Sequence, residues 1–235
     1  MIQTVPRTGS TSDDVAAKLR SGDLVREGDW LVADRQTAGR GRQGRTWADG
    51  SGNFMGSTVV QPGHGDPPPG TLALVAALAV QQTVAPYIPA PRQAQLKWPN
   101  DVMVDGAKLA GILLELEDRA VIVGIGVNLA SAPDLPDRPA VALANLGLTP
   151  DRDGFAQALA AAFALELERW RSAGLDPILR RWQALAHPVG TLLTVSDTGL
   201  KGTFAGLTDE GALQLRAADG TTHVVNAGEV RLANG

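Results

Sequence analysis

The sequence contains no cysteine, and this absence excludes several kinds of chemistry at once. Without cysteine there is no disulfide framework, no thiol nucleophile and no cysteine-ligated zinc site. Histidine is also scarce: His64, His187 and His223 are the only three, and they lie far apart in the sequence. We therefore expect no dedicated cluster of protein ligands for a metal ion.

Long apolar runs are missing as well. The most apolar stretch, Leu72 to Val80, is too short to span a bilayer and ends at two glutamines. The N-terminus, MIQTVPRTGS, lacks the apolar segment of a secretory signal. The net charge of −4 gives no reason to expect bulk binding to nucleic acid. These absences predict a cytoplasmic protein that binds neither a membrane nor DNA.

The length of 235 residues suits one main domain and a small satellite. Hydrophobic residues make up 44% of the chain and charged residues 20%, as in ordinary globular proteins. The composition changes after His187-Pro188, where short alternating segments separated by turn signals begin. We therefore expect a domain over 1–187 and a small antiparallel barrel over 188–235.

The main domain contains signals for both helices and strands. Ser10 to Asp13 offer capping oxygens for a helix that presents Val15 and Leu19. Further helices are predicted over 71–84, from Thr149-Pro150 onward, and from Asp176-Pro177 onward. Strands are predicted over 29–33, 54–60, 96–98, 102–104, 110–116 and 121–129, and in the barrel over 191–195, 201–207, 212–216, 222–225 and 229–232.

The most informative segment is GRGRQGRTW, residues 39–47. Glycines let a backbone approach a ligand closely, and arginines suit carboxylate and phosphate oxygens. The arginines would also repel one another unless an anion joined them, so we expect a loop that is mobile when empty. A solvated basic loop and an RNA-binding glycine/arginine segment are alternatives, although such RNA-binding segments are usually long and repetitive. The spacing fits neither a P-loop nor a Rossmann fingerprint.

Four segments together resemble the motifs of the biotin protein ligases. They are GRGRQGRTW at 39–47, KWPND at 97–101, KLAGILLE at 108–115 and GIGVN at 124–128, in the family's order. The resemblance implies an α+β fold, with a mixed-sheet catalytic domain of the class II synthetase-like biotin ligase type backed by helices. An SH3-like barrel would follow.

The resemblance also implies an ATP-dependent ligase. Such an enzyme activates biotin as biotinyl-5′-AMP and transfers it to a lysine of a biotin carboxyl carrier protein. The substrates would be biotin and ATP with Mg²⁺, and the reaction needs no acyl-enzyme. Because biotin's carboxylate and the α-phosphate of ATP repel each other, cations must be in place before they react.

The resemblance assigns roles to residues across the chain. The expected catalytic residues are Lys108, Arg40 and Asp101, of which Lys108 touches both reacting anions and Asp101 orients the acceptor amine. The expected biotin-binding residues are Ser10, Thr11, Ser12, Gln36, Gly39, Arg40, Gly41, Arg42, Lys108 and Gly111. The expected ATP-binding residues are Arg40, Arg42, Trp47, Asn100, Lys108 and Asn128.

Several of these residues also have plainer interpretations. Ser10 and Thr11 would then only cap a helix, Gln36 would be a surface amide, and Asp101 would stabilise a turn. Ser12 departs from the family, which usually has asparagine at this position. Serine can still donate and accept a hydrogen bond, but its side chain is shorter.

Two alternatives to biotin ligation remain open at this stage. A lipoate ligase or octanoyltransferase shares the catalytic fold, and a noncatalytic biotin-binding regulator belongs to another class. The motifs KWPND and GRGRxGRxW favour biotin, and Lys108 with the arginine loop favours catalysis. The Ser-Thr-Ser segment already begins at residue 10, so we expect the short type without a DNA-binding domain, and the resemblance favours a homodimer.

Overall fold

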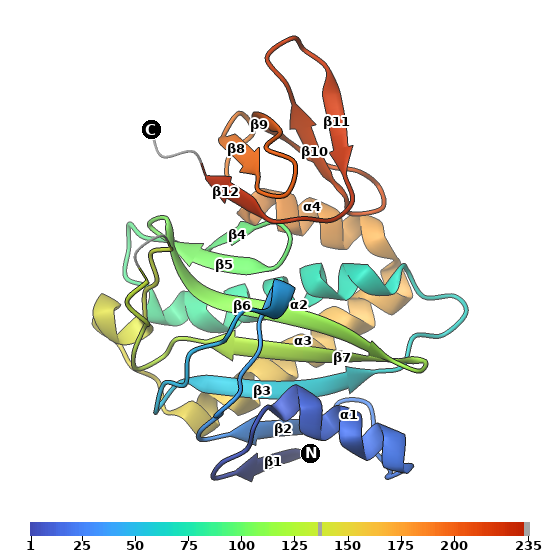
Figure 1. The fold of residues 1–235 in the computed structure, drawn as a ribbon, viewed down its shortest axis with the longest axis vertical. Helices are drawn as coiled ribbons and strands as arrows, with labels where there is room; N and C mark the ends of the chain where they lie inside the picture. Colours follow the sequence, from blue (N-terminus) through green and yellow to red (C-terminus); the bar gives the residue numbers. More distant parts are fainter. Residues whose placement is uncertain (136–137, 233–235) are drawn as a thin grey trace.

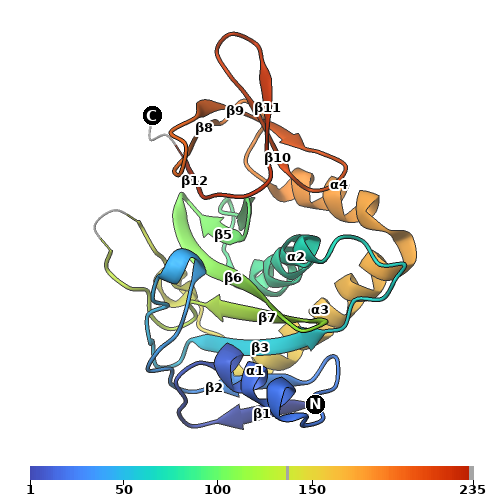
Figure 2. The ribbon, with the colours of Figure 1, turned by 45° about the vertical axis from the view of Figure 1, so that its right-hand side comes forward.

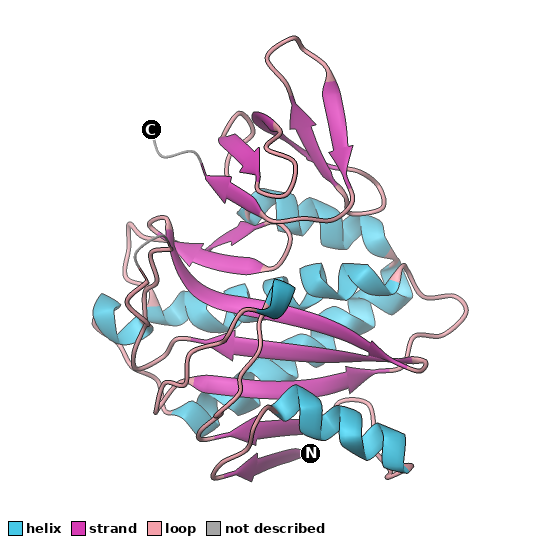
Figure 3. Cartoon of the chain, viewed as in Figure 1, coloured by secondary structure: helices cyan, strands magenta, loops and turns pink. Residues whose placement is uncertain are grey.

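The computed structural model describes residues 1–135 and 138–232 as an α+β fold. A seven-stranded mixed sheet carries helices on both faces, and a five-stranded antiparallel sheet follows at the C-terminal end (Figures 1 and 3). The expected fold class is therefore confirmed.

The large sheet has the strand order β1-β2-β3-β7-β6-β5-β4. In this sheet only β1 and β2 pair in parallel, and all other neighbouring strands pair antiparallel. The strands are β1 (Ile2–Val5), β2 (Trp30–Ala33), β3 (Phe54–Val60), β4 (Gln95–Lys97), β5 (Asp101–Val104), β6 (Ala107–Glu117) and β7 (Ala120–Val127).

The helices divide between the two faces of this sheet. Helix α1 (Thr11–Ser21) covers one face over β3 and β7, whereas α2 (Leu72–Val84) and α3 (Arg152–Ala173) pack on the other (Figure 2). Helix α4 (Leu175–Leu185) lies between α2 and the C-terminal unit. Among the described residues, no helix combines the length and apolar character needed to cross a membrane.

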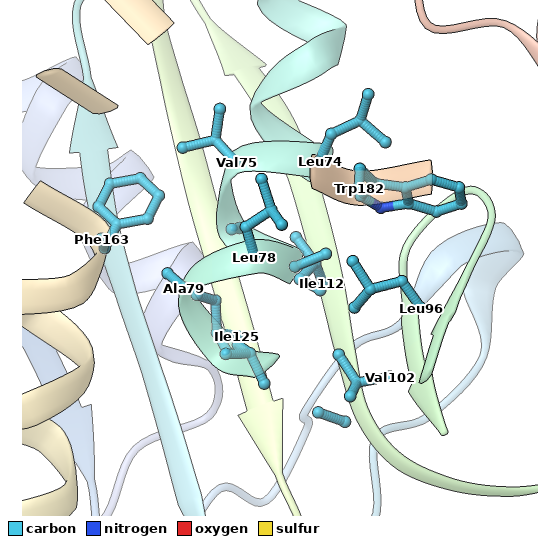
Figure 4. Packing of buried hydrophobic residues seen from close by; sticks show 14 of the residues in the cluster. Leu74, Val75, Leu78, Ala79, Leu96, Val102, Ile112, Ile125, Phe163 and Trp182 are labelled. Carbon is cyan, nitrogen blue, oxygen red and sulfur yellow. The ribbon is translucent and has the colours of Figure 1, made fainter. Parts of the chain in front are cut away.

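The main core lies between the sheet and α2. Ten of the thirteen α2 residues are buried, so this helix is apolar nearly all round, as its sequence predicts. Figure 4 shows Leu78 of α2 beside Ile112 of β6 and Ile125 of β7. A smaller apolar cluster that includes Val15 and Ile122 lies under α1 on the opposite face. Cores on both faces hold the central strands rigidly, and these strands support the site described below.

The C-terminal unit has the strand order β11-β10-β9-β8-β12 and is antiparallel throughout. Its strands are β8 (Leu192–Val195), β9 (Lys201–Leu207), β10 (Leu213–Arg216), β11 (Thr222–Val225) and β12 (Val230–Leu232). The Trp98 indole donates to Gly211 O at 3.1 Å, and Leu207 N donates to Gln183 Oε1 at 3.0 Å. These contacts join the unit to the turn after β4 and to α4. The division at residues 187 and 188 stays a prediction.

The predicted elements occur with small shifts at their ends, but β1 was not predicted. Only four residues long and mostly exposed or half-buried, β1 has no apolar alternation that would mark it as a strand. It forms because its backbone pairs in register with β2, from Ile2 opposite Trp30 to Val5 opposite Ala33. Such pairing is invisible to a local pattern.

His187 lies at the junction of the two sheets, and its buried Nε2 has no hydrogen-bond partner among the described residues. Burial lowers the pKa of His187 below its ordinary 6.5, and the charge of Lys97 lowers it further. As the pH falls, His187 therefore binds a proton near pH 6.5 in the unfolded chain but only at a lower pH in the folded chain. Folding stability should consequently fall as the pH drops below 6.5.

This dependence can be measured by urea unfolding at several pH values. His187→Phe should flatten the profile below pH 6.5, because the unfolded chain then has one fewer group to protonate. His64→Gln, at an exposed loop position, is the matched control and should leave the profile unchanged. An unchanged profile in His187→Phe would contradict the prediction.

Candidate active site

A cavity of about 280 Å³ opens on the sheet face that carries α1. Its walls come from the start of α1, the 39–47 loop, the β4–β5 turn, β6, β7 and the C-terminal unit. The predicted site residues that line it are Ser10, Thr11, Ser12, Gln36, Arg40, Gly41, Arg42, Trp47, Asn100, Asp101, Lys108, Gly111 and Asn128. The fold therefore gathers nearly all of them around one space.

Gly39 is the one predicted residue that is not part of the cavity wall. A side chain at this position would lie 2.8 Å from the Trp47 carbonyl oxygen and 3.0 Å from the Gln36 amide. Gly39 therefore permits a close approach between two protein segments. Gly39 thus lets Gln36 and Trp47, which do line the cavity, lie close to each other.

Three charged side chains form a compact group at one wall. Lys108 Nζ lies 2.6 Å from Asp101 Oδ1, and Lys97 Nζ lies 3.1 Å from Asp101 Oδ2. Asp101 begins β5, and Lys97 ends β4 four residues earlier, so the tight turn between the strands brings these two together. Lys108 reaches the same carboxylate from β6, which pairs with β5.

The carboxylate of Asp101 is deeply buried but remains charged. Burial raises the pKa of Asp101, yet the ammonium groups of Lys108 and Lys97 outweigh burial, so the pKa lies below its ordinary 3.8. With an ammonium on each oxygen, the carboxylate is a weak base in this arrangement. It gains a free oxygen only when one of the lysines moves away.

The 39–47 loop forms a narrow hairpin with a single 3₁₀ turn at Arg42–Gly44. Trp47 N donates to Gly39 O at 2.9 Å, and Gly41 N donates to Arg45 O at 2.7 Å. Gly44 adopts φ = 71°, in the left-handed region that glycine enters without strain. The turn aims the arginine side chains in different directions.

Two of the three loop arginines pair with carboxylates of the protein itself. Arg40 contacts Asp13 at 2.5 Å and Glu115 at 2.9 Å, and Arg45 forms a two-pronged pair with Glu229. The expectation that a ligand's anion joins these arginines is therefore wrong for Arg40 and Arg45, whereas Arg42 binds the Asn100 amide and Gly228 O. Acidic side chains from α1, β6 and the C-terminal unit already offset the repulsion.

The loop is also attached to the C-terminal unit at three points. Arg42 donates to Gly228 O at 3.1 Å, Gln43 donates to Asp197 at 3.2 Å, and Arg45 binds Glu229. The hydrogen bonds from Arg45 lower the pKa of Glu229, which keeps this carboxylate ionised. The small unit thus forms part of the site as one support of the loop.

The Trp47 indole lies on two glycines of the sheet. A side chain at Gly126 would collide with the indole ring, and one at Gly111 would lie 3.1 Å from it and 2.9 Å from Lys108 Nζ. The ring also lies 5.8 Å from Lys108 Nζ, within cation–π range. The space at Gly111 is thus used by Trp47 and Lys108 rather than left open for a ligand.

Two asparagines of the motifs are already engaged by the protein. Asn100 Nδ2 donates to Ile112 O at 2.5 Å and its Oδ1 accepts from Arg42 at 3.3 Å. Asn128 Nδ2 donates to Val141 O at 3.2 Å and to Lys108 O at 3.4 Å. Both amides therefore fix the backbone around the cavity in addition to lining it.

The closed end of the cavity is built from buried hydroxyl and amide groups. Ser10 caps α1, where its hydroxyl accepts from Asp13 N at 3.4 Å, so the capping interpretation is correct for this residue. Gln36 is buried rather than a surface amide, and Thr11 Oγ1 donates to it at 3.1 Å. Ser10 thus both caps the helix and lines the cavity, whereas Thr11 lines the cavity with its hydroxyl on Gln36.

Among the site residues that were not predicted are Ser57, Lys97 as a partner of Asp101, and Glu229. Lys97 stood inside the KWPND motif, and its spacing of four from Asp101 was a usable signal. Ser57 lies within a fully buried strand, and Glu229 lies 184 residues from its partner Arg45. No local pattern marks these two.

Comparisons with known proteins agree along the whole chain. The biotin/lipoate A/B protein ligase family matches residues 5–129, and the biotin protein ligase C-terminal domain matches residues 191–232. The first of these matches covers the start of α1, the loop and all three charged residues of the Asp101 group.

Relatives of similar length share a substantial part of the sequence. A biotin–[acetyl-CoA-carboxylase] ligase of Paracoccus denitrificans is 38% identical over 95% of this chain and 97% of its own length. Its counterpart in Mycobacterium tuberculosis is 37% identical over 97% of this chain and 88% of its own length.

The structure is similar to a solved biotin protein ligase from Aquifex aeolicus in complex with biotin and ATP. The TM-score is 0.85 at 25% identity, with 99% of each chain covered. Family match, identity over full length and shared fold agree. The chain therefore belongs to the biotin/lipoate A/B protein ligase family, among the biotin protein ligases.

Proposed function

We propose that the residues around this cavity carry out both half-reactions of an ATP-dependent biotin–[acetyl-CoA-carboxylase] ligase. The observation that carries the proposal is that one cavity is lined by cationic side chains in one part and by neutral hydrogen-bonding side chains in another. Lys108 and the arginine loop supply cations at the open side, and Ser12, Thr11 and Gln36 supply hydrogen-bonding groups at the closed end. A ligand with a polar ring and a carboxylate tail fits this division.

In the first half-reaction, a carboxylate oxygen of biotin attacks the α-phosphorus of ATP, and pyrophosphate leaves. Lys108 would move from Asp101 to the oxygens of the two anions, and Arg40 and Arg42 would add positive charge. Magnesium would arrive on the triphosphate as part of the substrate. Cations fixed before the reaction lower the barrier without further reorganisation.

In the second half-reaction, the lysine amine of the carrier attacks the carbonyl carbon of biotinyl-5′-AMP, and AMP leaves. Once Lys108 has turned to the phosphate, Asp101 Oδ1 would be free to accept a hydrogen bond from that amine. Lys97 would stay on Oδ2 and keep the carboxylate charged. One lysine thereby serves as a movable partner and the other as a fixed one.

The test is incubation of the purified chain with ATP, Mg²⁺, a carrier domain, and either biotin or lipoate. We expect biotinyl-5′-AMP by mass spectrometry and a biotin mass added to one carrier lysine. Preference for lipoate would favour the lipoate-ligase alternative. Binding of biotin without any adenylate would favour the noncatalytic regulator.

The proposal extends to the assembly and location of the protein. By likeness to the family, the chain would act as a homodimer in the cytoplasm, with the carrier domain of acetyl-CoA carboxylase as acceptor. Sedimentation of the purified chain tests the homodimer, and fluorescence imaging of a tagged chain tests the location.

Arg42→Gly should let biotinyl-5′-AMP escape from the site. The change removes the bonds of Arg42 to Asn100 and Gly228, and it adds a further glycine to the loop. A looser loop protects the intermediate poorly, so bystander lysines should be labelled several times more, even if carrier labelling falls.

This prediction can be measured by biotin incorporation into serum albumin beside a carrier domain. Arg92→Gly, at an exposed position outside the cavity, is the matched control and should behave as the wild type. Absence of any adenylate in Arg42→Gly would show that Arg42 acts in the chemistry and would contradict the escape argument.

Glu229→Gln should weaken the attachment of the loop to the C-terminal unit. A charged pair with two hydrogen bonds becomes a neutral contact, and Arg45 loses its carboxylate. We expect the KM for ATP in adenylate formation to rise about 10-fold, because the loop must then be ordered by the ligand. Glu210→Gln, exposed in the same unit, is the control. Equal KM values in both variants would contradict a supporting role.

A further inference from the structure

A chain of four buried polar side chains runs through the closed end of the cavity. It links Gln36, Thr11, Ser57 and Ser12, with Ser57 fully buried at its centre. Hydroxyl hydrogens can point either way in most chains of this kind. Here one end fixes the direction of every hydrogen bond.

The fixed end is the amide of Gln36. Thr11 N lies 2.7 Å from Gln36 Oε1, and because a backbone N–H only donates, the atom facing it must be the amide oxygen. Thr11 Oγ1 lies 3.1 Å from the same oxygen. That oxygen carries no hydrogen, so the Thr11 hydroxyl must donate its single hydrogen to it.

The donor and acceptor of the two remaining hydrogen bonds follow from this one. Thr11 Oγ1 has no second hydrogen, so across the 2.7 Å contact Ser57 donates and Thr11 accepts. Ser57 has thereby used its own hydrogen, so across the 2.9 Å contact Ser12 donates and Ser57 accepts. The Ser12 hydroxyl therefore turns its hydrogen inward and only lone pairs remain for the cavity.

We infer that Ser57 is a positioning residue that makes Ser12 a pure hydrogen-bond acceptor, and that Ser12 thereby selects a ligand with an N–H group at this end of the cavity. The inference rests on the proposed function, under which that group is one of the two ureido N–H groups of biotin. Asparagine, usual in the family here, carries both a donor and an acceptor, so Ser12 imposes the stricter polarity.

A neighbouring glycine keeps Ser12 in this position. A side chain at Gly124 would lie 2.8 Å from Ser12 Oγ and 3.6 Å from Ser57 Oγ. The absence of a side chain at Gly124 therefore leaves the Ser12 hydroxyl at the wall. Ser12 is also buried, so water competes poorly with a ligand for its lone pairs.

The consequence is discrimination between near-isosteric rings. In a cyclic carbamate analogue of biotin, a ring oxygen replaces one ureido N–H. Where that oxygen faces Ser12, two sets of lone pairs meet and neither finds a hydrogen. A buried group left unpaired in this way should weaken binding about 10- to 100-fold.

The experiment measures dissociation constants for biotin and the two carbamate regioisomers by calorimetry. In the wild type we expect both analogues to bind more weakly than biotin. In Ser57→Ala the Ser12 hydrogen is released and can turn to the ring oxygen. For one regioisomer, the ratio of its dissociation constant to that of biotin should therefore fall about 10-fold. The ratio for the other regioisomer should not change.

Two further variants separate this role from a general loss of structure. Ser12→Ala removes the acceptor itself and should lower the same ratio. Thr58→Val, next to Ser57 on β3, removes a part-buried hydrogen bond from Thr58 to Asp29 O, and it should lower stability without changing either ratio of dissociation constants. If both ratios of dissociation constants stay at the wild-type value in Ser57→Ala, Ser57 does not have the proposed role, regardless of the result for Ser12→Ala.

The outcome does not depend on turnover. If the wild-type chain binds biotin but forms no adenylate, the proposed function fails and the ratios still test the hydrogen-bond direction. If the chain forms adenylate and Ser57→Ala keeps the wild-type ratios, the inference fails and the proposed function stands.

Discussion

Lys108→Ala should slow the formation of biotinyl-5′-AMP about 10²- to 10³-fold, the usual cost of losing one preorganised electrostatic contact. The Lys108 ammonium lies at the cavity wall, 2.6 Å from Asp101 Oδ1 and 5.8 Å from the Trp47 ring. It can therefore reach the place where the charge of two anions must be offset. The neutral ring end of biotin does not need it, so much of the biotin affinity should remain.

A rapid-quench assay of adenylate formation measures this effect apart from transfer to the carrier. Lys201→Ala, at an exposed position of β9, is the matched control and should form adenylate at the wild-type rate. Circular dichroism should show both variants folded. Near-normal adenylate formation by Lys108→Ala would remove Lys108 from the mechanism.

Much of the fold follows from local signals in the sequence. The Ser10 cap predicts the start of α1, and the unbroken apolar run predicts the buried helix α2. The turn signals at Asp105 and Asp118 correspond to residues with φ of 50° and 53° between antiparallel strands. In each case the deciding interaction lies within a few residues, so a local pattern is sufficient.

The site was predictable to the extent that its residues stand in motifs. Lys108, Asp101 and the arginine loop meet at one cavity because each motif ends or connects a strand of the same sheet. Their partners were less visible. Arg40 pairs with Asp13 and Glu115 from other elements, and this pairing overturned the expectation of arginines without a counter-charge.

What the sequence could not supply were the groups whose role depends on pairing across the fold. Ser57 lies between Gly56 and Thr58 in a strand whose residues are all buried, so nothing beside it in the sequence distinguishes it from an ordinary core position. It becomes a site residue only because α1 brings the hydroxyls of Thr11 and Ser12 to it. Hydrogen-bond direction is a property of that assembled group and has no signature in the order of residues.

Removal of the Asp101 carboxylate should have the largest effect on folding. Asp101→Ala leaves Lys97 and Lys108 side by side without a counter-charge, and the Lys97 side chain is only 11% exposed. Breaking a buried ion pair from one side costs about 3–5 kcal/mol, because the remaining charge stays buried. We expect a fall of that size in the free energy of unfolding, measured by urea denaturation.

The pH dependence and a double variant test the electrostatic origin of this loss. Because the pKa of Asp101 lies below its ordinary 3.8, its contribution is present above that pH and is lost as the pH falls through the folded-state value. The difference in the free energy of unfolding between wild type and Asp101→Ala should therefore narrow below pH 3.8.

Lys97→Met combined with Asp101→Leu replaces most of the charged group with apolar side chains. This double variant should recover much of the stability without restoring transfer to the carrier. A single variant as stable as the wild type, or a double variant less stable than the single one, would show that the two lysines do not depend on Asp101.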